Sequence, residues 1–455
     1  MNSISSGDLL GPLFASAKMR AVLSDAAMLQ HMLDVEAALA RAEAANGVIP
    51  KSAAAPIAAA CQAKRFDIAA LGIAAGQAGN VAIPLVKALT AEVAKRDKNA
   101  ARFVHWGATS QDIIDTASVL ALREASALLD RDLARAVKGF VSLAKKHRKS
   151  VMAGRTWLQQ ALPTTFGLKA AEYAASLARS RTRMLAAVEE ASLLQFGGAS
   201  GTLAALGKKG AAVARGLGKS LGLAVAPAPW HAHSDRIAHA ASTIAIAIGE
   251  CGKIARDVSL MMQTEVGEVF EPEGAGRGGS STMPQKRNPA LSAQILAAAN
   301  LAPGLVSSLL AGLTHEHERG TGGWQASWFA LPQLLLIASG AFERTAEIAT
   351  GLEVDKARMR ANLEISNGLI MAEAVQFALA EKLGKSQAHD LVAKASKQAL
   401  NSAKHLKDAL RGLPEVTQIL SGKKLDDLFE PSNYLGETQK FIDAAIASAE
   451  RSLKK

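Results

Sequence analysis

Three long helical patterns in the middle of the chain constrain its fold most strongly. They run from Ile113 to about His147, from Pro163 to about Glu190, and from Arg236 to Glu268. All are much longer than the dozen or so residues of an average helix. No strand pattern and no β-α-β alternation appears beside them. We therefore expect an all-α protein whose long helices form a bundle, with polar clusters in the loops at its ends.

Shorter helical patterns flank the central ones. They cover residues 18–46, 84–95, 208–221, 291–313 and 331–352, and alanine-rich helical stretches continue beyond residue 355. We expect three helical domains, at residues 1–112, 113–355 and 356–455. The alanine-rich surfaces of the long helices would stay partly apolar in a monomer, so we also expect a homo-oligomer.

The charge and cysteine content exclude several classes of function. The net charge is +11, from 52 Lys and Arg against 41 Asp and Glu, but the basic residues are scattered and only 4% of residues are aromatic. This favours a small anionic substrate over a nucleic acid. Cys61 and Cys251 lack metal-ligand spacing and are expected to be free thiols. With no signal-peptide pattern and no apolar run near 20 residues, we expect a cytoplasmic protein without membrane contact.

A polar loop at Gly278 to Pro289 is the strongest candidate for chemistry. It reads Gly-Gly-Ser-Ser-Thr-Met-Pro-Gln-Lys-Arg-Asn-Pro and lies between two long helical patterns. Its glycines and prolines exclude both helix and strand. A solvated loop can have a similar composition. However, so many hydroxyl, cationic and amide groups, in a chain otherwise built of alanine and leucine, indicate a functional loop.

A second polar cluster precedes the first long helix, where His105 is followed by Thr109, Ser110 and Asp112. Thr-Ser-x-Asp is typical of an ordinary helix start, because these side chains cap free N–H groups. The same free N–H groups and the helix dipole also attract anions. With His105 nearby, we favour an anion site.

A third polar group, from His315 to Arg319, has a sequence that suggests a metal site. Its histidines are two residues apart, however, and residues at that spacing point to different faces of a helix. No third ligand follows, so we expect no metal.

Taken together, the clusters resemble the fumarase/aspartase superfamily, which includes argininosuccinate and adenylosuccinate lyases. The superfamily signature Gly-Ser-Ser-x-Met-Pro-x-Lys-x-Asn-Pro is matched in full by Gly279 to Pro289. Its Thr-Ser-x-Asp region is matched by Thr109 to Asp112. Its Gly-Arg-Thr-His region is matched by Gly154 to Trp157, with Trp157 in place of the histidine. The resemblance covers essentially the whole chain.

Within the superfamily, the chain is most similar to the 3-carboxy-cis,cis-muconate cycloisomerases of bacterial protocatechuate degradation, in the β-ketoadipate pathway. The stretches that carry this likeness are residues 154–159, 194–207 and 263–272. The resemblance implies a homotetramer with a shared helical core and active sites that draw on several subunits. It also implies a tricarboxylate substrate, and neither a metal nor an organic cofactor.

Trp157 fits that likeness chemically. Lyases that expel an amine or water use a histidine at this position for proton transfer, which tryptophan cannot perform. When lactone formation is read in reverse, the leaving group is a carboxylate, which departs as an anion without an acid. A simple packing role for Trp157, with another histidine doing the work, is the alternative.

The resemblance suggests roles for individual residues. Ser280 would exchange the proton on the substrate carbon, with Ser281 as the fallback. Lys286 and Asn288 would hold the carboxylate that becomes the doubly charged aci-anion. The other candidates would bind substrate: Thr109 and Ser110 with His105 beside them, and, less strongly, Arg155, Gln159, His231 and Arg319.

Two alternatives remain at this point. The first is an adenylosuccinate lyase, but the two arginines expected in the segment aligned with Leu13 to Met19 are absent, and so is the histidine replaced by Trp157. The second is a catalytically silent scaffold protein of the same fold. The intact loop with Ser280, Lys286 and Asn288 argues against a purely structural descendant.

Overall fold

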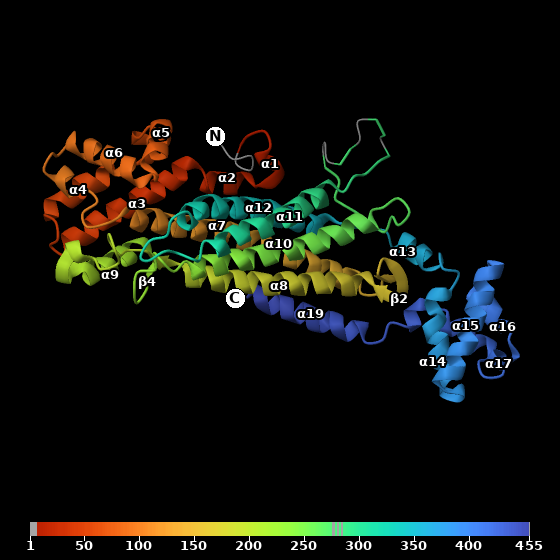
Figure 1. Cartoon of the computed structure of the whole chain (residues 1–455). Coiled ribbons are helices and arrows are strands. Elements are labelled where there is room, and N and C mark those ends of the chain that lie inside the picture. The colour runs from red at the N-terminus through yellow and green to blue at the C-terminus, as the bar shows by residue number, and fades with distance from the viewer. Residues whose placement is uncertain (1–6, 275–277, 280–281, 284, 455) are drawn as a thin grey trace. The chain divides into compact units, whose positions relative to one another are not determined.

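The computed structural model describes residues 7–274, 278–279, 282–283 and 285–454. Helices dominate this part of the chain (Figure 1). The α-helices are α1 Gly11–Phe14, α2 Ala17–Val22, α3 Asp25–Ala45, α4 Lys51–Ala60, α5 Ile68–Ala78, α6 Ala82–Ala94, α7 Ser110–Lys146, α8 Phe166–Ala191, α9 Gly210–Leu221, α10 Asp235–Met261, α11 Ala290–Ala311, α12 Gly323–Gly351, α13 Lys356–Leu363, α14 Ala372–Leu383, α15 Lys385–Ser402, α16 Leu406–Arg411, α17 Pro414–Thr417, α18 Gly422–Leu428 and α19 Thr438–Leu453. Short 3-10 helices are η1 Ala63–Arg65, η2 Ala100–Phe103, η3 Ala204–Lys209, η4 Leu369–Met371 and η5 Pro431–Asn433.

Short β ladders also occur, so the expectation of no strands is wrong. The strands β1 Val151–Thr156 and β2 Gln159–Thr165 form an antiparallel hairpin. In the other ladders, β3 Leu193–Leu194 pairs parallel with β4 Ala224–Val225, and β5 Val269–Phe270 pairs antiparallel with β6 Glu353–Val354. These strands are short or lack alternating apolar residues, which is why periodicity did not reveal them.

Most of the predicted helices are confirmed within a few residues. The pattern that starts at Ile113 is α7, and the pattern that ends near Glu190 is α8. The single helix predicted over residues 18–46 is two helices, α2 and α3, which Leu23 and Ser24 separate. Two boundaries were also wrong. The helix predicted to reach Glu268 ends at Met261, because the chain turns there toward β5. The helix predicted from Leu331 begins at Gly323, and Pro332 lies inside it.

The chain divides into two compact units. The first comprises Met1–Leu133, Ser180–Gly252 and Gln294–Glu343, and the second comprises Ala134–Arg179, Lys253–Ala293 and Arg344–Lys455. The long helices α7, α8, α10, α11 and α12 each contribute residues to both units. This division does not test the three domains expected from the sequence, which remain a prediction.

The first unit has a core built largely by α3, α4 and α6 around the start of α7. Leu33, Ile57, Leu85 and Leu89 are fully buried in it. These residues recur at helical spacing, so each helix turns one apolar stripe inward. The acids Glu36 and Glu43 of α3 are also buried on this inward side, which is unusual for a carboxylate.

The second unit has a core formed by α14 to α18 around Val375, Leu379 and Leu410 (Figure 1). A smaller apolar cluster joins the β1–β2 hairpin to α13 and η4 through Ala153, Leu363 and Met371. The hairpin is therefore fixed at its base by apolar contacts.

Helix α11 corrects the expectation that no apolar run approaches 20 residues. Among the described residues, it is the one helix long and apolar enough to cross a membrane by length and composition. Leu291, Ile295 and Ala298 of α11 are buried, and 28% of its most apolar 18-residue window is buried inside the protein. A core helix passes the same test of length and composition. The two cysteines, Cys61 and Cys251, are free and buried, which confirms the expectation of free thiols.

Gly139 provides a test of helix packing in the second unit. A Cβ atom at this position of α7 would lie 2.7 Å from the backbone C and O of Ala349 in α12. We expect Gly139→Ala to lower the free energy of unfolding by about 1–3 kcal/mol, because backbone atoms must move apart. Gly72 of α5 is the matched control, since no atom lies within 4 Å of a Cβ added there. Gly72→Ala should raise stability by about 0.5–1 kcal/mol in the same denaturation experiment, and a similar loss in both variants would contradict this packing.

Candidate functional site

The predicted site residues fall in both units. His105, Thr109, Ser110, His231 and Arg319 belong to the first unit, and Arg155, Gln159, Lys286 and Asn288 belong to the second. Ser280 and Ser281 lie outside the described residues.

The Thr-Ser-x-Asp segment is a capped helix start. Ser110 is the first residue of α7, and the N–H of Thr109 donates to Oδ2 of Asp112 at 3.0 Å. This is the reciprocal half of a capping box, in which an acid in the first turn reaches back to the residue before the helix. The side chains of Thr109 and Ser110 are half-buried, and neither hydroxyl forms a hydrogen bond with another described residue. They are available to a ligand.

Asp112 anchors the neighbouring loop. Its carboxylate also accepts from the N–H groups of Gly197 and Gly198, at 2.8 and 2.9 Å. Burial raises the pKa of Asp112 to about 6, although hydrogen bonds from Gly197, Thr109 and Gly198 oppose that shift. Asp112 therefore fixes the backbone of this region.

His105 is paired with a buried acid. Its Nδ1 lies 2.6 Å from Oε1 of Glu36 in α3. Burial alone would lower the pKa of the His105 imidazole. The charge and hydrogen bond of Glu36, with a contribution from Asp112, outweigh burial and raise that pKa. The contact with Glu36 therefore favours the protonated form of the ring.

A hydrogen-bonded chain connects Arg319 to Asp115. Arg319 Nε donates to Oε1 of Gln111 at 3.0 Å, and its Nη2 donates to the carbonyl of Ala199 at 3.1 Å. Gln111 Nε2 donates in turn to Oδ2 of Asp115 and to the carbonyl of His231. The chain thus brings His231 and Arg319 together through one glutamine.

Trp324 completes this network. Its Nε1–H donates to Oδ1 of Asp115 at 2.7 Å. Burial raises the pKa of Asp115 to about 7, against the hydrogen bonds from Trp324 and Gln111. Asp115 is thus a buried carboxyl group whose two oxygens each accept a hydrogen bond.

A cavity of about 200 Å³ lies beside the network. Apolar side chains such as Met28, Met32 and Leu331 share its lining with His231 and Trp328. Nδ1 of His231 and Nε1 of Trp328 are buried there without a hydrogen-bond partner among the described residues.

In the second unit, the loop from Gly278 to Pro289 is neither helix nor strand where the structure describes it, as predicted. Its base is closed by the N–H of Asn288, which donates to the carbonyl of Gly278 at 3.0 Å. Gly278 has φ +64°, and a Cβ there would lie 2.7 Å from the Asn288 carbonyl oxygen. Only glycine fits this close approach.

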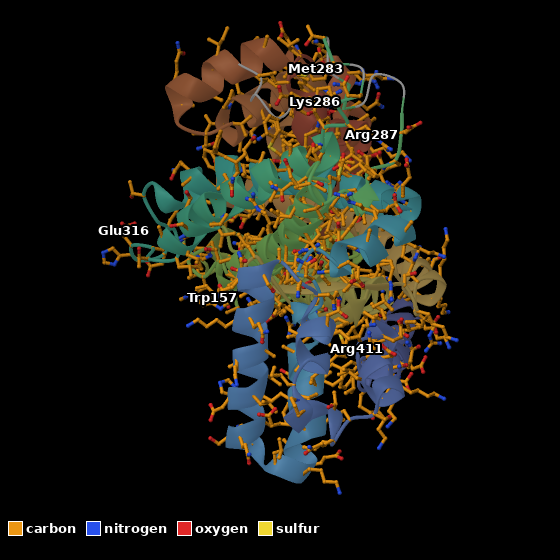
Figure 2. The ribbon with its side chains drawn as sticks, turned by 90° about the vertical axis from the view of Figure 1, so that its right-hand side faces the viewer. Trp157, Met283, Lys286, Arg287, Glu316 and Arg411 are labelled. Carbon is orange, nitrogen blue, oxygen red and sulfur yellow. The ribbon has the colours of Figure 1, made fainter. Side chains whose placement is uncertain are left out.

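Lys286 and Asn288 line one cleft at the base of this loop, with Gly278 and Gly279. Figure 2 shows Met283, Lys286 and Arg287 along the loop. Lys286 is exposed and forms no ion pair with any described residue. Its charge remains available in the cleft.

Arg287 fixes the same loop to the β5–β6 ladder. Its guanidinium donates to Glu353 at 3.0 and 2.8 Å and to the carbonyl of Glu271 at 2.9 Å, and it lies over the ring of Phe270. The buried Glu271 carboxylate accepts from the N–H groups of Leu291 and Ser292 at the start of α11. These contacts hold the ends of the loop in place.

Arg155 is also held by a buried acid. It makes two hydrogen bonds to Glu268, at 2.8 and 2.7 Å, and Asn362 Nδ2 donates to the same carboxylate at 2.8 Å. The Arg155 charge is thus compensated within the unit. A substrate-binding role for Arg155 stays a prediction.

The tip of the hairpin is exposed and apolar. Trp157 and Leu158 link β1 to β2 with φ +52° and +64°, and they are 98% and 75% exposed. Positive φ at both turn positions matches a type I′ turn, which residues other than glycine, asparagine and aspartate adopt at a cost. Gln159 follows at the start of β2 and is exposed too. The hairpin thus ends in an exposed apolar tip.

The segment from His315 to Arg319 is not helical, so the expectation that its histidines point to different faces of a helix is wrong. Residues 312–322 are turns and irregular chain, so helix faces do not apply. Glu316 is engaged by the N–H of Thr321 at 2.8 Å. Among the described residues, no group of three or more His, Cys, Asp or Glu side chains could hold a metal ion.

Sequence reasoning missed several acids that hold the candidate residues. Glu36, Asp115, Glu268 and Glu271 were not singled out. For Glu36 a signal was present, because it lies one turn from Met32 and Leu33 on the apolar stripe of α3. An acid on the core side of a helix needs a partner.

Comparison with known proteins gives matches over nearly the whole chain. Residues 14–304 match the family model described as Lyase, and residues 368–445 match the one described as Adenylosuccinate lyase C-terminus. A 3-carboxy-cis,cis-muconate cycloisomerase from Bradyrhizobium diazoefficiens is 59% identical over 443 residues, 97% of this chain and 98% of that protein. The enzyme of that name from Pseudomonas aeruginosa is 49% identical over 447 residues, 98% of this chain and 97% of that protein.

A solved structure agrees with the sequence matches. The crystal structure of 3-carboxy-cis,cis-muconate lactonizing enzyme from Pseudomonas putida matches with a TM-score of 0.93 at 46% identity. It covers 98% of this chain and 100% of that chain. The likeness therefore extends to the fold.

The Arg155–Glu268 pair gives a test of how this region is stabilised. Glu268 is fully buried, so Glu268→Gln would leave the Arg155 charge uncompensated and replace one of the two acceptor oxygens by an NH2 group. We expect a loss of about 3 kcal/mol in the free energy of unfolding, measured by chemical denaturation.

The matched control is Glu430→Gln. Glu430 makes the same two-bond contact to Arg360, at 2.9 and 2.8 Å, but both side chains are more than 40% exposed. Solvent screening should limit its loss to below about 1 kcal/mol. Equal losses in the two variants would show that burial does not set the strength of the Arg155 pair.

Proposed function

This chain belongs to the lyase family of the fumarase/aspartase superfamily, and we propose that it is a cycloisomerase that closes 3-carboxy-cis,cis-muconate to 4-carboxymuconolactone. The observation that carries the proposal is 59% identity to a cycloisomerase of that name over 97% of the chain. The mostly helical fold is that of the superfamily. This activity belongs to the protocatechuate branch of the β-ketoadipate pathway.

The proposed reaction adds a carboxylate oxygen of the substrate across a double bond of the same molecule. A new C–O bond closes the lactone ring, and a proton is delivered to the carbon beside another carboxylate. The intermediate carries two negative charges on that carboxyl group. Lys286 and Asn288 line one cleft, which supports their role as the groups that hold it.

Ser280 is the proposed proton donor to the carbon, with Ser281 as the alternative. Both follow Gly278 and Gly279, which line the cleft that Lys286 and Asn288 share. A serine hydroxyl must be activated to exchange a proton, and backbone N–H groups of the loop would supply that stabilisation. These two assignments rest on the sequence signature alone.

The remaining candidates would bind the other carboxylates. The free hydroxyls of Thr109 and Ser110 at the start of α7 suit one carboxylate, with the cationic ring of His105 as a further contact. Arg319 suits another, because its two described partners are uncharged oxygens. His231, Arg155 and Gln159 are weaker candidates for the same task.

We further propose a cytoplasmic homotetramer whose active sites are shared between subunits and need no cofactor. The exposed hairpin tip supports this, because Trp157 and Leu158 would otherwise leave a large apolar surface in water. Exposed Phe329 of α12 and Leu301 of α11 support it as well. Sedimentation or light scattering of the purified protein measures the state directly.

A second candidate function is elimination from adenylosuccinate. It is favoured by the match of residues 368–445 to the adenylosuccinate lyase C-terminal model. Ultraviolet absorbance of a mixture of the protein with adenylosuccinate would detect that reaction. Loss of diene absorbance with freshly made 3-carboxy-cis,cis-muconate, without any change in adenylosuccinate, would support the cycloisomerase. The opposite pattern would replace it, and inactivity on both would leave a scaffold protein.

Variants of the loop test the proposed roles. Ser280→Ala and Lys286→Met should each reduce turnover of carboxymuconate by about 10²-fold or more, because one removes the proton donor and the other removes a positive charge from the developing anion. Lys423→Met, at an exposed lysine of α18, serves as the control for loss of a surface charge.

The measurement is kcat and KM by diene absorbance, with light scattering and thermal melting to check the fold. Near-normal turnover of Ser280→Ala would remove Ser280 from the chemistry. Unchanged kinetics of Lys286→Met would remove the carboxylate clamp.

A further inference from the structure

Two buried acids lie one above the other on α3. Glu36 and Glu43 are seven residues apart, which is two helical turns, and their side chains are 1% and 0% exposed. Neither Glu43 oxygen has a hydrogen-bond partner among the described residues, and Oε2 of Glu36 has none either. Burying carboxyl groups with so few hydrogen-bond partners costs free energy.

Glu43 is the neutral member of this pair of acids. Burial, and then the nearby Glu36 carboxylate, raise the pKa of Glu43 to about 9, so Glu43 is neutral at pH 7. Two neighbouring buried carboxyls do not both ionise readily. Glu36 is the acid of the two that has a basic partner, because its Oε1 lies 2.6 Å from Nδ1 of His105.

The backbone around His105 fixes the geometry of this contact. His105 has φ +57°, a left-handed conformation that a residue with a side chain adopts only at a cost. Gly107 has φ +71°, and a Cβ there would lie 2.7 Å from Cδ2 of Leu206. His105 and Gly107 thus both lie in the left-handed region, and Gly107 approaches Leu206 closely.

This contact leaves the second ring nitrogen of His105, Nε2, for a ligand. Nδ1 is bound to Glu36, and no hydrogen bond joins Nε2 to any described residue. The His105 side chain is 17% exposed, so the ring is reachable although it is largely buried. Thr109 and Ser110 follow in the same segment and supply hydroxyls.

We propose that Glu36 is a positioning residue that keeps His105 protonated and oriented, so that its Nε2–H donates to a carboxylate of the substrate. The proposal deepens the function proposed above and rests on it for the identity of the ligand. It predicts a cationic contact for an anionic substrate that exists only while Glu36 is charged. Glu36 itself touches no substrate.

The charged and titratable groups that act on His105 come from two helices. They are Glu36 of α3 and Asp112 of α7, while Glu43 and Cys61 lie next to Glu36. Glu36 and Asp112 raise the pKa of His105, and burial lowers it. Removing the Glu36 charge leaves burial less opposed, so the pKa of His105 must fall.

The test is a titration of His105 in protein labelled with ¹³C at histidine Cε1, with the signal assigned by its absence in His105→Gln. Glu36→Gln keeps the shape and one acceptor oxygen but removes the charge. We expect the His105 titration to move about one pH unit or more to lower pH. The basic limb of kcat/KM for carboxymuconate should move by the same amount, so the loss should grow with rising pH toward about tenfold.

Glu43→Gln is the matched control. It lies on the same helix, is equally buried and is already neutral, so it should leave both the His105 titration and the pH profile in place. A merely structural role of Glu36 would lower the melting temperature without moving either profile. An unmoved His105 titration in Glu36→Gln, or an equal shift in Glu43→Gln, overturns the proposal.

The two proposals fail in different ways. If Glu36→Gln moves the His105 titration but the wild-type protein does not convert carboxymuconate, the pairing stands and the proposed function is wrong. If the wild-type protein converts carboxymuconate and Glu36→Gln changes neither His105 nor the pH profile, the function stands and the role of Glu36 is wrong.

Discussion

Buried carboxylates that accept hydrogen bonds from the backbone hold the candidate loops of this protein in place. Asp112 binds the N–H groups of Thr109, Gly197 and Gly198 in the first unit. Glu271 binds those of Leu291 and Ser292 in the second. Inside a helix the backbone N–H and C=O groups bond to each other. The first N–H groups and the last C=O groups of the helix have no such partner. At the N-terminal ends of α7 and α11, Asp112 and Glu271 accept from such N–H groups.

The helices could be predicted from the sequence because their stabilising contacts recur at regular spacing. The apolar residues of α7 repeat through many turns, and Thr109 with Asp112 marks its start, so the boundary was found within a few residues. The loop at Gly278 was predicted on equally local grounds, since glycine and proline exclude regular structure. The β1–β2 hairpin could not be found this way. Its turn is Trp157-Leu158, which contains none of the usual turn residues.

The partners of the candidate residues could not be predicted, because they come from distant parts of the chain. His105 is 69 positions from Glu36, and Arg155 is 113 positions from Glu268. No local pattern encodes such a pair. The burial of an acid on an apolar stripe shows only that a partner exists. The sequence therefore identified the polar residues and left open which of them are already neutralised inside the protein.

The basic residues differ in whether a carboxylate of the protein compensates their charge. Arg155 and Arg287 each contact a glutamate with two hydrogen bonds, so that glutamate compensates much of their positive charge. Arg319 is held by two neutral oxygens, and Lys286 forms no ion pair with a described residue. A polyanionic substrate is attracted by charge that the protein has not already compensated. Arg319 and Lys286 therefore have more positive charge to offer a tricarboxylate than the two arginines that hold the loops.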